Sequence, residues 1–224
     1  MAAHGRGTSI PPVAAILVAA GAGSRLGAGK PKAFCEVRGR TLLDHSLGRF
    51  SAHPAIREVV AVVPAGFESE IDSTGAVRVV AGGAERPDSV AAGLSVLSAD
   101  IQYVLVHDAA RPFVPADVIS RVVEALLAGA EAVVPVVPVV DTIKRVFEDV
   151  VVETVDRSAL RAIQTPQGFL RSVLAAAHDA GGRPVTDDAS MVERLGSAVV
   201  VVNGSEESFK ITTAWDLRVA EAMT

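Results

Sequence analysis

Residues 16–34 read "ILVAAGAGSRLGAGKPKAF", an apolar run that passes directly into a loop rich in glycine. The run at 13–20 has the length and the valine and alanine content of a strand buried on both faces. Arg25, Lys30 and Lys32 lie among and just after the glycines. Backbone amides unobstructed by Cβ atoms, combined with positive charge, favour a loop that binds phosphate groups. A basic loop that is merely solvated is the alternative.

Two common glycine motifs do not fit this loop. A Walker motif requires a glycine five positions before the glycine of its Gly-Lys pair, and a serine or threonine after the lysine. Ser24 and Pro31 occupy those positions around Gly29 and Lys30. A dinucleotide-binding fingerprint requires its third glycine at the position of Leu26. The loop therefore indicates phosphate binding of another type.

Composition narrows the class of protein. The chain of 224 residues is 50% hydrophobic but only 4% aromatic, and it carries a net charge of −5. A mildly acidic chain is poorly suited to bind nucleic acid through a broad basic face. Cys35 is the single cysteine, which excludes an intrachain disulfide and fits a reducing compartment. No apolar run approaches the roughly 20 residues of a transmembrane helix, so we expect a cytoplasmic protein that binds neither nucleic acid nor a membrane.

The N-terminal residues 1–12 predict a short disordered tail, followed by a single domain over 13–224. A secretory signal peptide is the alternative, because basic residues precede an apolar run that ends in small residues at 20–22. Pro11 and Pro12 interrupt that pattern, and cleavage after it would remove the first predicted strand. We therefore interpret the segment as a tail.

Apolar runs alternate with helical patterns along the rest of the chain. This alternation predicts βαβ units, and hence an α/β fold with a doubly wound, mostly parallel sheet. Ligands of such sheets bind beyond the carboxyl ends of the strands, here after Ala20, Val80 and Val106. The predicted strands are 13–20, 57–64, 77–83, 103–106, 130–139 and 198–204, and the predicted helices are 41–53, 88–98 and 116–129.

Residues 139–157 break the alternation. Apolar and polar residues alternate on both sides of Glu148 and Asp149, which predicts a β-hairpin arm with an exposed tip. A long hairpin leaves apolar side chains and strand edges uncovered, so we expect it to pack against a second copy of the chain in a homodimer. A hairpin folded back on its own sheet is the alternative.

Seven segments carry a resemblance to a known family. In their order and spacing they resemble the 2-C-methyl-D-erythritol 4-phosphate cytidylyltransferases, within the sugar-nucleotidyltransferase superfamily, and the match runs from about Val13 to the C-terminus. The glycine loop alone would indicate only the superfamily, whereas "HDAARP" with "TPQ" is specific. The segments are residues 19–34, 82–94, 106–112, 141–145, 155–169, 186–190 and 209–213.

The resemblance implies a Rossmann-like nucleotidyltransferase fold and a reaction between two phosphorylated substrates. CTP and 2-C-methyl-D-erythritol 4-phosphate would give CDP-methylerythritol and pyrophosphate, in the non-mevalonate synthesis of isoprenoid precursors. Ribitol-5-phosphate cytidylyltransferases share much of the pattern, so ribitol 5-phosphate is the alternative acceptor. A catalytically silent nucleotide-binding protein is a third possibility, although it would be expected to lack the cations.

The resemblance also assigns the nucleotide site. Arg25, Lys32 and Lys210 match the cations that stabilise the reacting triphosphate. Asp108 matches a carboxylate that suits Mg²⁺, with a cap for the following turn as its alternative, and for His107 we favour a structural role over a metal-binding one. The matched CTP-binding residues are Ala19, Ala20, Gly21, Ala22, Gly23, Gly82, Gly83, Ala84, Arg86, Ser89 and Asp108.

The acceptor site is shared across a dimer in the family. Thr142 and Arg157 would reach in from the arm of the partner, although Arg157 could instead form a structural salt bridge. Thr186 reads first as a helix cap together with Asp187, and second as a substrate contact. The remaining matched residues, from one subunit, are Asp108, Arg111, Thr165 and Lys210.

Overall fold

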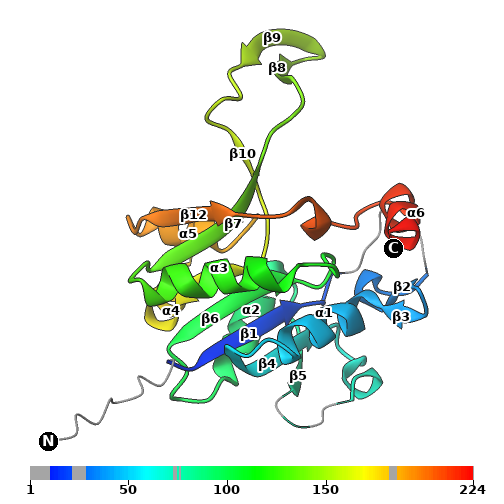
Figure 1. Cartoon of the computed structure of the whole chain (residues 1–224), viewed down its shortest axis with the longest axis vertical. Helices are drawn as coiled ribbons and strands as arrows, with labels where there is room; N and C mark the ends of the chain where they lie inside the picture. Colours follow the sequence, from blue (N-terminus) through cyan, green and yellow to red (C-terminus); the bar gives the residue numbers. More distant parts are fainter. Residues whose placement is uncertain (1–10, 22–28, 73–74, 76, 182–185, 224) are drawn as a thin grey trace, which may run out of the picture.

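The computed structural model describes residues 11–21, 29–72, 75, 77–181 and 186–223. Its centre is an eight-stranded sheet in the order β10-β7-β11-β6-β1-β4-β5, with β12 also paired to β7 (Figure 1). The strands of this sheet are β1 (Val13–Val18), β4 (Ile56–Val63), β5 (Val77–Ala81), β6 (Tyr103–Asp108), β7 (Ala132–Pro138), β10 (Arg161–Ile163), β11 (Gln167–Leu170) and β12 (Val199–Asn203).

Helices cover both faces of the sheet. Ala15 and Leu17 of β1 belong to the apolar cluster under α1 and α3, whereas Ala14 and Ile16 belong to the cluster under α2, α4 and α5. Successive side chains of a strand point to opposite faces, so one strand serves both clusters. The predicted doubly wound α/β fold is confirmed. The helices are α1 (Leu42–Ser51), α2 (Arg86–Ser95), α3 (Ala116–Leu127), α4 (Arg171–Asp179), α5 (Ala189–Arg194) and α6 (Ala214–Ala222).

Most of the sheet is parallel, as predicted. Strands β5, β4, β1 and β6 run parallel to one another, and β12 runs parallel to β7. Strand β11 was not predicted: it lies between β6 and β7 and runs antiparallel to both. Strand β10, which precedes β11 in the chain, pairs antiparallel with the other end of β7. One short segment therefore lines β7 along most of its length.

Side-chain capping marks the starts of helices α1 and α2. The side chains of Thr41 and Asp44 form a capping box at the start of α1, where the sequence predicted a helix. Helix α2 begins at Arg86, two residues before the predicted Asp88. The reason is that Glu85 occupies the N-cap position and the Asp88 carboxylate accepts the N–H of Glu85 from inside the first turn.

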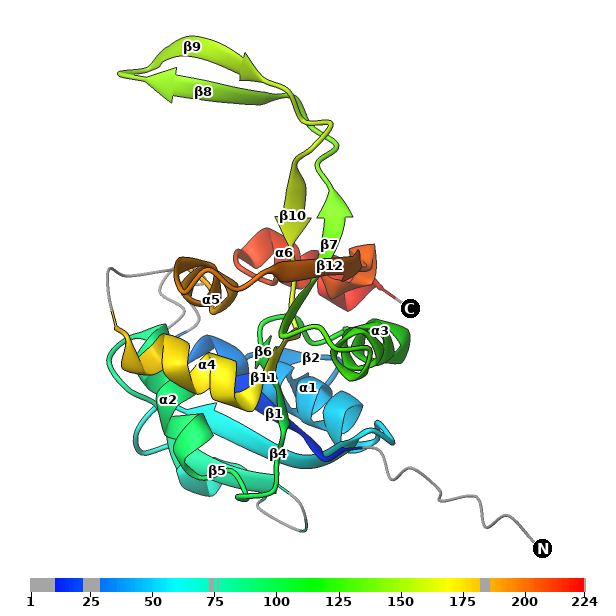
Figure 2. The same ribbon diagram turned by 90° about the vertical axis from the view of Figure 1, so that its left-hand side faces the viewer.

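The predicted arm is present as an antiparallel hairpin of β8 (Ile143–Phe147) and β9 (Val150–Val155). Glu148 and Asp149 form its tip with φ of 44° and 64°, values typical of a tight two-residue turn. The hairpin forms its own two-stranded sheet and extends away from the body of the molecule (Figure 2). The alternative of a hairpin folded back on the main sheet is therefore wrong.

The smaller elements complete the fold. Strands β2 (Glu36–Val37) and β3 (Arg40–Thr41) form a ribbon beside α6. Of the predicted tail, residues 1–10 lie outside the described residues, and the carbonyl of Pro12 accepts the N–H of Gln102 at 3.1 Å. In the described part of the chain, none of the helices combines the length and the apolar composition needed to cross a bilayer.

Candidate active site

The site begins where the central strands β1 and β6 end together. Val18 and Asp108 are partners in the register of this parallel pair, and the N–H of Ala109 donates to the Val18 carbonyl at 3.1 Å. Asp108 is the last residue of β6, whereas the sequence predicted a strand that ended at Val106. The two extra ladder residues fix the Asp108 backbone at the carboxyl edge of the sheet, where ligands of such folds bind.

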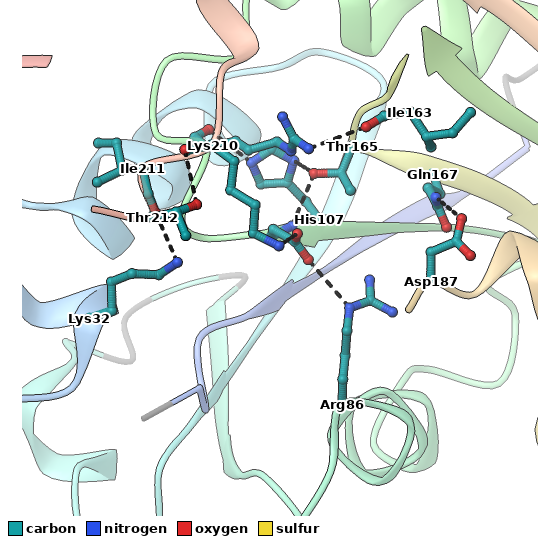
Figure 3. A network of polar contacts seen from close by, with 12 residues as sticks. Lys32, Arg86, His107, Ile163, Thr165, Gln167, Asp187, Lys210, Ile211 and Thr212 are labelled. Atoms are coloured by element: carbon teal, nitrogen blue, oxygen red, sulfur yellow. Dashed lines mark hydrogen bonds and ion pairs between the residues drawn. The ribbon is translucent and has the colours of Figure 1, made fainter. Parts of the chain in front are cut away.

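Two cations hold the Asp108 carboxylate. Lys210 donates to its Oδ2 atom at 2.7 Å, and the Nε atom of Arg86 lies 3.4 Å from its Oδ1 atom (Figure 3). Burial by itself would raise the pKa of Asp108, but the charges of Arg86 and Lys210 outweigh it and hold that pKa well below its usual range. The carboxylate is therefore ionised at neutral pH.

Arg86 bridges this carboxylate to a second, deeper one. Its NH1 atom donates to Oδ2 of Asp188 at 2.5 Å, and Nε2 of His178 lies 3.3 Å from the other oxygen of Asp188. The Asp188 side chain is fully buried. Burial opposes the charge of Arg86, but Asp188 and Asp108 together raise the pKa of its guanidinium. Asp188 was not predicted as a site residue, although it is the second aspartate of "TDDAS".

Lys32 lies close in space to the segment of chain that carries Lys210. It is the first residue of the short helix η2 (Lys32–Phe34), and its ammonium group donates to the carbonyl of Ile211 at 2.8 Å (Figure 3). Ile211 follows Lys210 and is itself held by an N–H bond to the carbonyl of Ala110 at 2.8 Å. The third predicted cation, Arg25, lies outside the described residues, as do Ala22 and Gly23 of the predicted phosphate loop.

The first of two neighbouring cavities has a volume of about 290 Å³ and lies against the end of β1. It brings together most of the predicted nucleotide-binding residues. Its lining includes Ala19, Ala20, Gly21, Lys32, Gly83, Ala84, Arg86, Ser89, Asp108 and Lys210.

Gly82 does not line this first cavity, although the sequence placed it among the contacts. A Cβ atom on Gly82 would lie 2.4 Å from Cβ of Ala20 and 2.8 Å from Oγ of Ser89. The absence of a side chain therefore allows the loops after β1 and β5 to approach each other and shape the cavity wall.

The second cavity, of about 370 Å³, lies on the other side of Asp108. It contains the predicted acceptor-site residues Arg111, Thr165 and Thr186, and it shares Arg86, Asp108 and Lys210 with the first cavity. The two cavities are therefore adjacent, and their common wall consists of the Asp108 carboxylate between the cations of Arg86 and Lys210. Lining residues that the sequence analysis missed are Gln164, Gln167, Asp187, Ser190 and Glu193.

A short hydrogen-bonded chain underlies the second cavity. The N–H of Asp108 donates to Oγ1 of Thr165 at 3.1 Å, and that oxygen lies 2.9 Å from Nδ1 of His107. His107 is fully buried and its Nε2 atom lies 3.1 Å from the carbonyl of Arg111. These contacts give His107 a structural role. The Arg111 guanidinium donates to the carbonyls of Ser208 at 2.7 Å and Ile163 at 3.3 Å.

Thr186 lines the second cavity and is not the cap of helix α5. The N-cap residue of that helix is Asp188, and the Asp187 carboxylate accepts the N–H of Ser190 at 3.3 Å. Asp187 also accepts a hydrogen bond from Nε2 of Gln167 at 2.8 Å (Figure 3). The predicted capping by Thr186 is therefore wrong, and the described geometry leaves that residue at the cavity.

Thr142 and Arg157 lie at the base of the arm, exposed, and neither lines the first or the second cavity. Figures 1 and 2 show the arm directed away from the sheet that carries the site. Within one chain, the described residues thus separate these two side chains from Asp108 and its partners.

Comparisons with known proteins agree with this geometry. The family model of 2-C-methyl-D-erythritol 4-phosphate cytidylyltransferase (IspD) matches residues 13–224. The chain is 50% identical over 220 residues to the enzyme of that name from Saccharopolyspora erythraea, covering 94% of this chain and 98% of the relative. It is 49% identical over 218 residues to that from Rhodococcus jostii, covering 95% of each.

Solved structures give the same result. The crystal structure of 2-C-methyl-D-erythritol 4-phosphate cytidylyltransferase from Thermus thermophilus matches with a TM-score of 0.80 and 39% identity, covering 92% of this chain and 96% of that chain. The 4-diphosphocytidyl-2C-methyl-D-erythritol synthase of Anaerococcus prevotii matches with a TM-score of 0.82 and 31% identity, covering 96% and 98%. The chain therefore belongs to the 2-C-methyl-D-erythritol 4-phosphate cytidylyltransferase family and is a nucleotidyltransferase.

Proposed function

We propose that the first cavity holds CTP, that the second holds 2-C-methyl-D-erythritol 4-phosphate, and that the two react at their common wall. The chain joins these substrates to give CDP-methylerythritol and pyrophosphate, a step in the synthesis of isoprenoid precursors. The observation that carries the assignment is the sharing of Arg86, Asp108 and Lys210 by both cavities. A phosphate in the second cavity would lie next to a triphosphate in the first.

The chemistry depends on charge and position. The acceptor phosphate is itself the nucleophile, and negative charge accumulates around the α-phosphorus as the bond to pyrophosphate breaks. Lys32 and Lys210 offer ammonium groups on one side of the first cavity, where fixed cations stabilise such a transition state. Arg25, which follows β1 in the sequence and lies outside the described residues, is the third cation that we propose.

The base of CTP has a matching place in the first cavity. Gly83 and Ala84 offer backbone groups, and the hydroxyl of Ser89, which donates to the Glu85 carbonyl at 3.2 Å, keeps an oxygen lone pair for a base amino group. A pocket that satisfies the amino group of cytosine leaves an unpaired acceptor against uracil, which supports selection of CTP over UTP.

Asp108 is the proposed ligand of Mg²⁺. The described residues contain no group of three His, Cys, Asp or Glu side chains arranged around a metal, but Mg²⁺ needs only one or two carboxylates with phosphate oxygens and water. An ionised carboxylate bordering the first cavity fits this requirement. A bound Mg²⁺ would neutralise charge on the triphosphate, while Arg86 keeps the carboxylate in place.

The arm supports a homodimer with shared sites. Phe147 is 67% exposed and Val150 is 64% exposed, an apolar surface that a second copy of the chain would cover. In such a dimer Thr142 and Arg157 of one arm complete the second cavity of the other chain, with Arg157 adding a charge for the acceptor phosphate. The proposed location of the enzyme is the cytoplasm.

The acceptor is tested by measuring pyrophosphate release from CTP and Mg²⁺ with either 2-C-methyl-D-erythritol 4-phosphate or ribitol 5-phosphate. We expect kcat/KM to be higher for the methylerythritol compound by at least about 100-fold, since a cavity that pairs the hydroxyls of one polyol leaves polar groups unpaired against another. Preferential turnover of ribitol phosphate would overturn the proposal. UTP in place of CTP tests the base pocket in the same assay.

A further inference from the structure

The carbonyl of Arg111 fixes the tautomer of His107. It lies 3.1 Å from the Nε2 atom, and because a carbonyl oxygen only accepts, Nε2 must carry the hydrogen. The ring is fully buried, with its centre 4.7 Å from that of Phe50, and burial in an apolar environment disfavours the charged ring with two hydrogens. With its one hydrogen on Nε2, the ring leaves Nδ1, which lies against the Thr165 hydroxyl, as an acceptor.

The Thr165 hydroxyl is constrained by that acceptor. Its oxygen lies 2.9 Å from Nδ1 of His107, so its single hydrogen points there. The backbone N–H of Asp108 donates to the same oxygen at 3.1 Å and occupies one of its two lone pairs. Thr165 is 5% exposed and lines the second cavity. A group in the cavity that reaches this oxygen therefore meets one lone pair and no hydrogen.

We propose that His107 is a positioning residue which orients the Thr165 hydroxyl so that it offers the second cavity a hydrogen-bond acceptor only. The inference rests on the proposed function, because it assumes that the polyol phosphate occupies this cavity. An acceptor-only oxygen pairs with a hydroxyl of the polyol, whereas an ionised phosphate oxygen has no hydrogen to donate to it. Thr165 thus selects the pose in which a polyol hydroxyl, and not the phosphate, lies against it.

The tautomer can be measured without any substrate. ¹⁵N NMR of the imidazole nitrogens of His107 in the intact protein at pH 7 should find Nε2 protonated and Nδ1 unprotonated. The opposite tautomer, or a doubly protonated ring, would overturn the inference. This result does not depend on which acceptor the enzyme uses, so failure here is distinct from failure of the proposed function.

A double-mutant cycle tests whether His107 acts through Thr165. His107→Phe and Thr165→Val should each raise KM for the acceptor about 10-fold and leave KM for CTP unchanged, because each removes one hydrogen bond of the chain. The double variant should be no worse than Thr165→Val alone. Effects that multiply would show that His107 acts independently and would contradict the proposal.

Two further variants separate positioning from general damage. Thr165→Ser keeps the hydroxyl and should keep KM for the acceptor close to that of the wild type. His53 is also buried, with its Nε2 atom 3.0 Å from Oγ of Ser120, so His53→Phe is a matched loss of a buried histidine. It should leave KM for the acceptor unchanged. If His107→Phe does not fold, two measurements still test the proposal: the NMR experiment and the comparison of Thr165→Val with Thr165→Ser. Equal KM values for the acceptor in those two variants would refute the role of the hydroxyl.

Discussion

Lys210 donates a hydrogen bond to Asp108 at 2.7 Å across 102 positions of the chain. The Lys210 side chain in this pair is 43% exposed and that of Asp108 is 13% exposed. The ammonium end of the pair is thus open to solvent, whereas the carboxylate is largely buried and has Arg86 as a second partner. Lys210 can therefore exchange the carboxylate for a phosphate oxygen as substrate enters, and the pair holds the ammonium group at the wall between the two cavities until then.

The loss of Lys32 should slow the reaction far more than it weakens binding. For Lys32→Ala we expect kcat to fall about 100- to 1000-fold, the usual effect of removing one preorganised charge at a developing anion. Steady-state kinetics with CTP and the acceptor measures this. Lys30→Ala is the matched control, since Lys30 pairs at the surface with Glu36 at 3.3 Å. Full turnover by Lys32→Ala with normal nucleotide binding would contradict the catalytic role.

A methyl group at Gly82 should damage the nucleotide cavity selectively. In Gly82→Ala the new Cβ would collide with Ala20 and with the Ser89 hydroxyl, so the loops after β1 and β5 must separate. We expect KM for CTP to rise at least about 10-fold while KM for the acceptor stays the same. Gly48→Ala is the control, because its Cβ would meet only the flexible end of Arg40. An unchanged KM for CTP would refute this account of Gly82.

The shared-site dimer predicts complementation between two inactive variants. Lys32→Ala disables the body of a chain and Arg157→Ala disables its arm, so a mixed dimer contains one site with both defects and one with neither. Co-expressed variants carrying different tags, purified through both tags, should recover up to about half of the wild-type activity.

Each variant alone should remain nearly inactive, and deletion of residues 141–155 should give a monomer in sedimentation experiments. A mixed dimer without activity, or an intact chain that sediments as a monomer, would rule out the shared site.

Asp188 should contribute strongly to stability. Asp188→Asn leaves the Arg86 guanidinium without its deepest partner, and breaking a buried ion pair costs about 3 kcal/mol in the free energy of unfolding. Urea denaturation measures the change. The control is Asp117→Asn, which removes an exposed pair with Arg121 at 2.7 Å and should change the stability little. Equal effects of the two substitutions would contradict the buried role of Asp188.

The stability should fall in mild acid because of His107. Its pKa is lowered from 6.5 to about 4 in the folded protein, so the unfolded chain binds a proton between these values that the folded chain does not. Stability is therefore complete above pH 6.5 and is lost as the pH falls toward 4, by up to about 3 kcal/mol. The difference in unfolding free energy between wild type and His107→Phe, measured by urea denaturation from pH 7 to 4.5, should narrow as the pH falls. A constant difference would contradict a neutral buried ring.

Local patterns predicted the parts of the fold that local forces determine. The capping residues of α1, the run that forms β1 and the turn at Glu148 and Asp149 are all encoded by neighbours in the chain. Strand β11 was not predicted because its four residues show no clear alternation of apolar and polar side chains. Only their pairing with β6 and β7 makes them a strand. The residues of the predicted site were assigned largely through family resemblance.

The ion pairs of the site could not be derived in this way. Arg86 meets Asp108 and Asp188 because separate connections of the sheet end at one edge, and no pattern within a window of the sequence records that meeting. The N-cap position of Asp188 was readable from "TDDAS", but its complete burial follows from the packing of α5 on the sheet.

The antiparallel direction of β11 places the residues of the two cavities on separate segments of the chain. Because β11 runs antiparallel to β6, its beginning, and not its end, reaches the edge where Asp108 lies. Thr165 and Gln167 therefore line the second cavity and not the first. The described residues of the loops after β1 and β5 line the first cavity, the proposed place of the nucleotide. Substitutions at the start of β11 could therefore change the choice of sugar phosphate while the residues proposed to bind CTP stay the same.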